Sequence, residues 1–297
     1  MLVSVSRPMA VARVPFCPVL SHRCQVDTAD MPMPPSFTAH NIVLDDGRQT
    51  KPDAPPMSRL PWFVSAAHLL SAFLPGSPKQ YRIADLGCCE GGYAVEFARL
   101  GYEVLGSDIR QANIAACDFV KSAVDLPHLH FVQDDVRNLR KYGKFDAIFC
   151  CGLLYHLEKP IEFIHLLSDA TLRVLILNTH FATDDERQVR TYNLSAAAEN
   201  EGALGRWYTE YPEGSELAQL QADARWSSWD NSRSFWLERE YILQAMRASG
   251  FDLTLEEFGA ADIVHDLKTG YYRSDGRGTF VGWKSPLNVD QPTVTQR

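Results

Sequence analysis

Acidic residues and glycines surround one short turn that could hold a small ligand. An apolar stretch containing Asp85 runs into a turn with Gly87 at its start and Gly91 at its end, and a helix is expected directly afterwards. Glycines let a ligand approach the main chain closely, and N–H groups at a helix start can bind an anionic group. The dinucleotide fingerprint GxGxxG is not matched, because Cys89 stands where its second glycine would be.

Further carboxylates follow the next two apolar stretches. Asp108 comes 23 residues after Asp85, at a position where a carboxylate can accept hydrogen bonds from both hydroxyls of a ribose. Asp134 and Asp135 end the third stretch, where a carboxylate could bind an adenine amino group. Each of these signals alone is weak evidence for a ligand site. Acidic residues that end successive strands after a glycine-rich turn are together strong evidence for one.

The elements that must position these residues alternate between apolar strands and amphipathic helices, which predicts an α/β fold with a Rossmann-like, doubly wound sheet of seven mostly parallel strands. We expect the ligand at the carboxyl ends of the strands. The predicted strands are 81–86, 102–107, 128–133, 145–151, 172–179, 251–257 and 279–284, the last antiparallel to its neighbour. The predicted helices are 58–74, 92–100, 111–124, 160–170 and 238–248.

The pattern stops after the fifth strand, and we interpret residues 181–236 as an inserted lid or substrate-binding segment, called the insertion below. From Asp184 to Glu240 the chain has 12 acidic residues and 6 arginines. The same stretch holds several tryptophans and tyrosines. They could form an aromatic wall for a planar or cationic acceptor, or the core of the insertion itself.

Composition limits the classes of partner and compartment. The chain has 297 residues and 29 Lys and Arg against 37 Asp and Glu, a formal charge of −8 that disfavours nonspecific binding to nucleic acid. Apolar runs are too short to span a bilayer. The seven cysteines include two adjacent pairs and no paired CxxC motifs, so we expect no metal site and a cytoplasmic protein. Prolines interrupt residues 1–57, which we interpret as a leader and linker.

The stretch 81–179 resembles the class I S-adenosylmethionine-dependent methyltransferases. The resemblance implies S-adenosylmethionine as cofactor and a methyltransferase domain over residues 58–297, as a monomer or homodimer. The departure from the family's pattern is Cys89, in place of the usual second glycine. The residues that it implies at the cofactor are Asp85, Gly87, Cys88, Glu90, Gly91, Asp108, Ile109, Asp135, Val136 and Cys151.

Within that superfamily, the segment Gly152-Leu-Leu-Tyr155-His156-Leu resembles a branch that includes small-molecule O- and N-methyltransferases and the tRNA wobble-uridine carboxymethyl transferases. The acidic insertion favours a small-molecule acceptor over tRNA. Two alternatives stay open: a tRNA-modifying transferase, and a noncatalytic binding protein with this fold. Failure to match GxGxxG disfavours an NAD-dependent oxidoreductase.

Two histidines are candidate general bases for the acceptor. His156 follows the fourth strand and His180 the fifth, and for both the competing interpretation is a structural role. The candidate substrate-contacting residues are Tyr155, Trp207, Tyr208, Trp229 and Trp236.

Overall fold

The structure is a computed structural model that describes residues 35–212, 216, 225–258 and 268–286. All of these residues belong to one unit, which begins at Pro34. Residues 1–34 of the leader and linker that the sequence predicts over 1–57 lie outside the described residues. No helix among the described residues is both long enough and apolar enough to cross a membrane.

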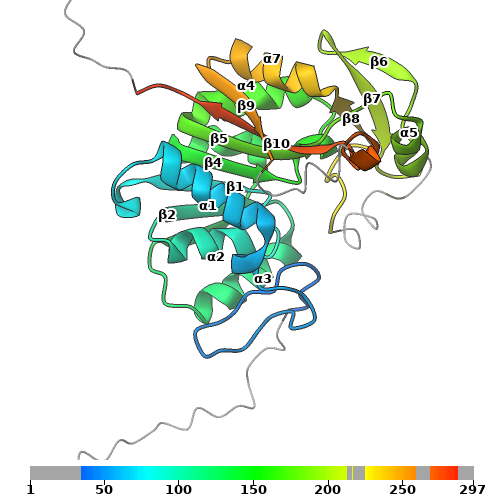
Figure 1. Ribbon diagram of the computed structural model, residues 1–297. Coiled ribbons are helices and arrows are strands. Elements are labelled where there is room, and N and C mark those ends of the chain that lie inside the picture. Colours follow the sequence, from blue (N-terminus) through cyan, green and yellow to red (C-terminus); the bar gives the residue numbers. More distant parts are fainter. Residues whose placement is uncertain (1–34, 213–215, 217–224, 259–267, 287–297) are drawn as a thin grey trace, which may run out of the picture. The chain divides into compact units, whose positions relative to one another are not determined.

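A seven-stranded sheet runs through this unit in the order β3-β2-β1-β4-β5-β10-β9 (Figure 1). The first five strands are parallel, and β10 pairs antiparallel with both β5 and β9, as the sequence predicts. The strands are β1 (Arg82–Leu86), β2 (Glu103–Asp108), β3 (Leu129–Gln133), β4 (Phe145–Cys151), β5 (Thr171–His180), β9 (Leu253–Glu257) and β10 (Arg277–Trp283).

Helices cover both faces of the sheet, because alternate strand residues face opposite sides and both sides are apolar. One core cluster joins Ile83 and Val104 to α1 (Pro61–Phe73), α2 (Gly92–Arg99) and α3 (Gln111–Ser122). The other joins Ala84 and Leu105 to α4 (Pro160–Ala170) and α7 (Arg239–Ala248). Short 3-10 helices connect these elements: η2 (Met57–Arg59), η3 (Pro78–Gln80), η4 (Val136–Tyr142) and η5 (Leu154–His156).

Residues 35–57 differ from the predicted linker. Ile42, Leu44 and Met57 are buried in the core cluster that contains α1 and α2. Isolated bridges pair Val43 with Gln49 and Asn41 with Pro56. The prolines prevent a helix here, as expected, but an extended chain can still bury its apolar side chains. The core therefore begins before the predicted boundary at residue 58.

The insertion has regular structure that its sequence pattern does not predict. It contains α5 (Glu186–Tyr192) and a second sheet in the order β6-β7-β8, all antiparallel. The strands are β6 (Ala197–Asn200), β7 (Ala203–Thr209) and β8 (Arg233–Leu237). A short helix, α9 (Tyr271–Asp275), packs against α5 and leads into β10. The second sheet lies beside the main sheet near its β10 side (Figure 1).

Candidate functional site

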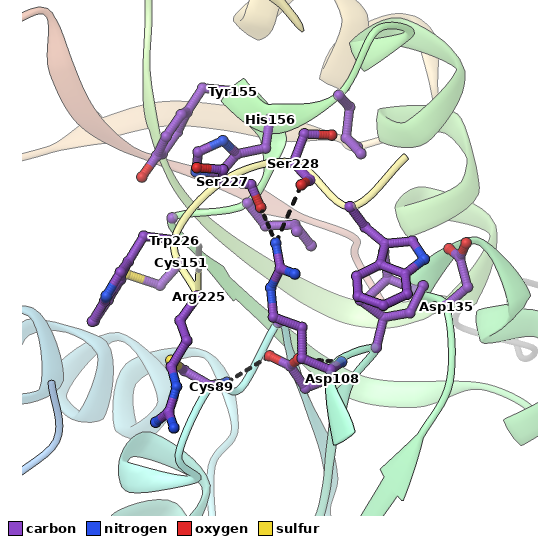
Figure 2. Close-up of a pocket in the computed structure, with 18 of the residues that line it drawn as sticks. Cys89, Asp108, Asp135, Cys151, Tyr155, His156, Arg225, Trp226, Ser227 and Ser228 are labelled. Atoms are coloured by element: carbon purple, nitrogen blue, oxygen red, sulfur yellow. Dashed lines mark hydrogen bonds between the residues drawn. The ribbon is translucent and has the colours of Figure 1, made fainter. Parts of the chain in front are cut away.

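A cavity of about 300 Å³ opens at the carboxyl ends of β1, β2 and β4. The predicted residues Asp85, Gly87 and Asp108 line it, together with residues from the loops that follow β3 and β4. A segment of the insertion, residues 225–230, forms part of its wall (Figure 2). The site thus lies where a doubly wound sheet places its ligand.

Asp85 presents an unsatisfied carboxylate oxygen at this cavity. Its side chain is 2% exposed, and Oδ2 has no hydrogen-bond partner in the part of the chain that the structure describes. Burial raises the pKa of Asp85 to about 7. A buried carboxylate oxygen without a partner is costly. The position is therefore suited to a ligand group that is cationic or donates hydrogen bonds.

Asp108 is held in place by two main-chain donors. The N–H of Cys89 donates to Oδ2 at 3.0 Å (Figure 2). The N–H of Arg110 donates to Oδ1 at 2.8 Å. Burial raises the pKa of Asp108 above its ordinary value. Each carboxylate oxygen has more than one acceptor direction, so both can still accept a hydrogen bond from a ligand hydroxyl.

Apolar and acidic residues line the neighbouring wall. Ile109, Asp135 and Val136 line the cavity, as predicted. Asp134 does not line it, and its carboxylate accepts hydrogen bonds from Asn138 and from the Tyr142 hydroxyl. Asp135, which the family resemblance implies at the cofactor, therefore lines the cavity, whereas Asp134 does not. Two apolar side chains can enclose a planar base, and the carboxylate beside them can accept a hydrogen bond from its amino group.

Three predicted cofactor residues support the turn rather than lining the cavity. Cys88 is buried 4.0 Å from Cys117, measured between the sulfur atoms. Gly91 has φ +82°, and a Cβ there would lie 2.7 Å from the Phe131 ring. Glu90 turns away and accepts hydrogen bonds from the main-chain N–H groups of residues 38–40. These residues shape the turn, and the ligand-facing positions are Gly87 and Cys89.

At the other end of the view in Figure 2, away from Asp108, lie Tyr155 and His156. Both line the cavity, as does the predicted Cys151. The Nδ1 atom of His156 is 2.8 Å from Oε1 of Glu210, a residue that directly follows β7 in the insertion. The structure therefore joins one predicted base to an acid that the sequence analysis did not select.

His180 does not line the cavity. Its ring stacks on Trp236 at a centroid distance of 4.8 Å and meets the edge of Tyr155 at 4.8 Å. Burial lowers the pKa of His180 to about 4, so the ring is neutral near pH 7. These contacts correspond to the structural interpretation of His180 rather than to a base facing a substrate.

Of the candidate substrate aromatics, Tyr155 and Trp229 line the cavity. Trp236 is 2% exposed, and Tyr208 stacks on it at 5.3 Å. Trp207 packs against Phe235 at 4.9 Å. Trp236 and the partly buried Tyr208 therefore belong to a cluster within the insertion, whereas the partly buried Trp207 packs on the core cluster that also contains Ala84 and Leu105.

Several cavity residues lack a distinguishing signal in the sequence. The guanidinium of Arg110 donates to the carbonyls of Ser227 and Ser228, which ties the 225–230 segment to the end of β2. Arg277, the first residue of β10, also lines the cavity and donates to Asn178 at 2.9 Å. Isolated arginines are usually solvated, and only the folded chain shows that these two face the site.

Comparisons with known proteins identify part of the chain. Residues 83–171 match a protein-family profile described as "Methyltransferase domain". A tRNA U34 carboxymethyltransferase from Colwellia psychrerythraea is 28% identical over 110 residues, covering 36% of this chain and 34% of that protein. One from Wolinella succinogenes is 29% identical over 194 residues, covering 62% of this chain and 69% of that protein. The chain thus spans about a third of the length of the Colwellia relative.

Solved structures share the architecture. The N-terminal domain of EvdMO1, crystallised in the presence of SAH and D-fucose, superposes with a TM-score of 0.58 at 21% identity, covering 82% of this chain and 90% of that chain. The same domain with SAH bound gives a TM-score of 0.56 at 22% identity, covering 77% and 82%. The predicted fold is confirmed, and the part of it that matches the methyltransferase-domain profile is residues 83–171.

Proposed function

We propose that this protein binds S-adenosylmethionine in the cavity at the carboxyl edge of the sheet and transfers its methyl group to an acceptor. The unsatisfied Oδ2 of Asp85 is the observation that carries the proposal. The cofactor's methionine part has an ammonium group, which would satisfy that buried oxygen and neutralise its charge.

The rest of the cavity fits the other parts of the cofactor. Asp108 would accept from the ribose hydroxyls, held in position by its two main-chain donors. Ile109 and Val136 would enclose the adenine, with Asp135 at its edge. Gly87 has φ +67° and no side chain between the main chain and the cavity, which permits close approach.

When bound, the cofactor supplies a methyl group on a positively charged sulfur, which is already activated for displacement. The chain's own residues would then orient the acceptor and, for an oxygen or nitrogen acceptor, receive its proton. His156 lines the cavity and is the base that we propose.

We propose a small molecule as the acceptor, methylated on oxygen or nitrogen. Residues 225–230 form part of the wall of a cavity of about 300 Å³, and the stretch from Asp184 to Glu240 is acidic. The second candidate is tRNA modification, which the names of the Colwellia and Wolinella relatives favour.

Calorimetric titration with S-adenosylhomocysteine tests cofactor binding. We expect wild type to bind and Asp108→Asn to lose about 100-fold in affinity, because hydrogen bonds to a charged group contribute roughly 1.5–3 kcal/mol each. Asp134→Asn is the matched control at the end of β3, since Asp134 faces away from the cavity, and it should bind like wild type. Absence of binding by wild type, or equal binding by Asp108→Asn, would refute the proposal.

The tRNA candidate has its own measurement. It requires copurifying nucleic acid, visible as a raised ratio of absorbance at 260 to 280 nm, and an affinity for tRNA that falls steeply with salt. A small-molecule enzyme shows neither. A noncatalytic protein would bind S-adenosylhomocysteine without transferring a methyl group to any acceptor tested.

A further inference from the structure

Glu210 is a buried carboxylate from the insertion that contacts the proposed base. Its side chain is 1% exposed. Oε1 is 2.8 Å from Nδ1 of His156 and accepts from the Ser234 hydroxyl at 2.8 Å, while Oε2 accepts from the N–H of Ser228 at 3.1 Å. Within the described residues no lysine or arginine forms an ion pair with it. A carboxylate buried in this way needs hydrogen-bond donors on both oxygens.

These contacts determine which ring nitrogen of His156 carries the proton. An ionised carboxylate only accepts hydrogen bonds, so Nδ1 must donate to it. In the neutral ring the lone pair is then on Nε2. No hydrogen bond to Nε2 is formed by the described residues, and the His156 side chain is 14% exposed and lines the cavity. The free lone pair is therefore available to a bound molecule.

The insertion also holds the main chain around His156. The carbonyls of three successive residues, 155–157, accept hydrogen bonds from residues of the insertion. The Trp236 indole donates to the carbonyl of Tyr155 at 3.0 Å, and the Asn231 amide donates to that of His156 at 3.1 Å. The Phe235 N–H donates to that of Leu157 at 3.0 Å. The Tyr155 ring lies 4.2 Å from the imidazole, between ring centroids. Both the backbone and the ring of His156 are thus fixed from outside the main sheet.

We propose that Glu210 is a positioning residue that holds His156 in the tautomer whose Nε2 accepts a proton from the acceptor. This inference rests on the proposed methyl transfer. It narrows the proposed substrate class to acceptors that lose a proton in the reaction, because these need such a base. A hydroxyl group and a protonated amine are acceptors of this kind. In the step, the acceptor atom bonds to the methyl carbon, the carbon–sulfur bond breaks with its electron pair going to sulfur, and the acceptor proton moves to Nε2.

The substitution Glu210→Gln makes a sharp prediction. The N–H of Ser228 can only donate, so the amide oxygen of the glutamine takes the Oε2 position and its NH2 group faces His156. An NH2 group donates, so Nδ1 must accept and the ring proton moves to Nε2. The variant therefore reverses the tautomer while leaving the shape of the side chain almost unchanged.

Two-bond ¹H–¹⁵N NMR of histidine side chains measures the tautomer without any acceptor, and the His156 signals are identified by their loss in His156→Gln. Above neutral pH we expect the proton on Nδ1 in wild type and on Nε2 in Glu210→Gln. The control is Glu201→Gln, another insertion glutamate, which accepts from the N–H groups of Ile161 and Glu162 and does not line the cavity. It should keep the wild-type tautomer.

A proton on Nε2 in wild type would overturn the proposal, and so would an unchanged tautomer in a folded Glu210→Gln. The wild-type spectrum alone decides the question if the variant does not fold. Titration with S-adenosylhomocysteine separates this result from the proposed function. If wild type has the expected tautomer but does not bind, methyl transfer fails while the positioning role of Glu210 stands.

Discussion

The main sheet and the insertion build opposite ends of one cavity in different ways. At the sheet edge, Asp85 and Asp108 belong to adjacent parallel strands in fixed register, so the backbone ladder alone sets their spacing. In the insertion, Glu210 reaches His156 across 54 positions of sequence, and the contact depends on the packing of β7, β8 and the 225–230 segment.

This difference separates the two tasks of the proposed enzyme. The end of the cavity that would bind the methyl donor holds Asp85 and Asp108 and is called the donor end below. Its geometry is determined by strand order and a glycine-rich turn, which leave little freedom for the carboxylates. The opposite end, called the acceptor end, holds His156 and Glu210 and is assembled from side chains on long connections. Sequence changes there can alter which acceptor is bound without disturbing the sheet. Changes at the two ends should therefore affect cofactor binding and proton transfer separately.

The largest effect is expected at the turn of the donor end. A Cβ at Gly91 would lie 2.7 Å from the Phe131 ring, with φ at +82°. Gly91→Ala should destabilise the fold by about 3 kcal/mol or more, from overpacking plus a strained backbone, and abolish binding of S-adenosylhomocysteine. Gly47→Ala is the control for φ alone, because Gly47 has φ +86° with nothing within 4 Å of the added Cβ. Urea denaturation compares the two, and equal losses would contradict this account of the turn.

A smaller effect concerns the proton on Asp85. With its pKa raised to about 7, the free protein holds a proton there at lower pH. The ammonium of the ligand needs the carboxylate, so binding releases that proton. Affinity for S-adenosylhomocysteine should fall up to about tenfold for each pH unit below 7 and level off above it.

The matched variant is Asp85→Asn, which has no proton to release. Calorimetry at pH 6 in buffers of different ionisation enthalpy should show about one proton released by wild type and none by the variant. A wild-type affinity that does not change between pH 5.5 and 8 would contradict the role given to Asp85.

The smallest effect is expected at His180, the predicted base that packs in the insertion's aromatic core. Its folded pKa of about 4 lies below the ordinary value of 6.5, so as pH falls the unfolded chain takes up the proton first. The stability that His180 contributes is present above pH 6.5 and is lost as pH falls toward 4. Between pH 7 and pH 5, the free energy of unfolding should therefore fall by about 1–2 kcal/mol less in His180→Asn than in wild type.

Chemical denaturation at the two pH values measures this difference. His40, whose pKa is also lowered to about 4 by burial, remains in both proteins and cancels in the comparison. Affinity for S-adenosylhomocysteine should stay at the wild-type level, and a large loss of binding in His180→Asn would place this ring at the cofactor after all.

At the donor end, the sequence predicts which residues meet at the edge of the sheet. Asp85, Asp108 and Asp135 each end an apolar stretch, and parallel strands bring such ends to one edge. Glu90 and Cys88 show the limit of this reasoning, because a motif gives the turn but not the direction of each side chain. Residues 35–57 show a second limit, since prolines exclude a helix but not burial.

The acceptor end is not predictable in the same way. Glu210 is one of 12 acidic residues between Asp184 and Glu240, and no local pattern separates it from the others. Its role depends on burial beside His156, a contact between segments far apart in the chain. Arg110 and the 225–230 segment show the same dependence on folding.

Titration of S-adenosylhomocysteine into wild type, Asp108→Asn and Glu210→Gln tests the division between the two ends most directly. The account predicts that Asp108→Asn loses about 100-fold in affinity. Glu210→Gln should bind within about twofold of wild type, because the amide oxygen of the glutamine can keep the hydrogen bond from Ser228, the residue that connects Glu210 to Arg110 at the end of β2. Equal losses of affinity in both variants, or no loss in either, would contradict this division between the two ends.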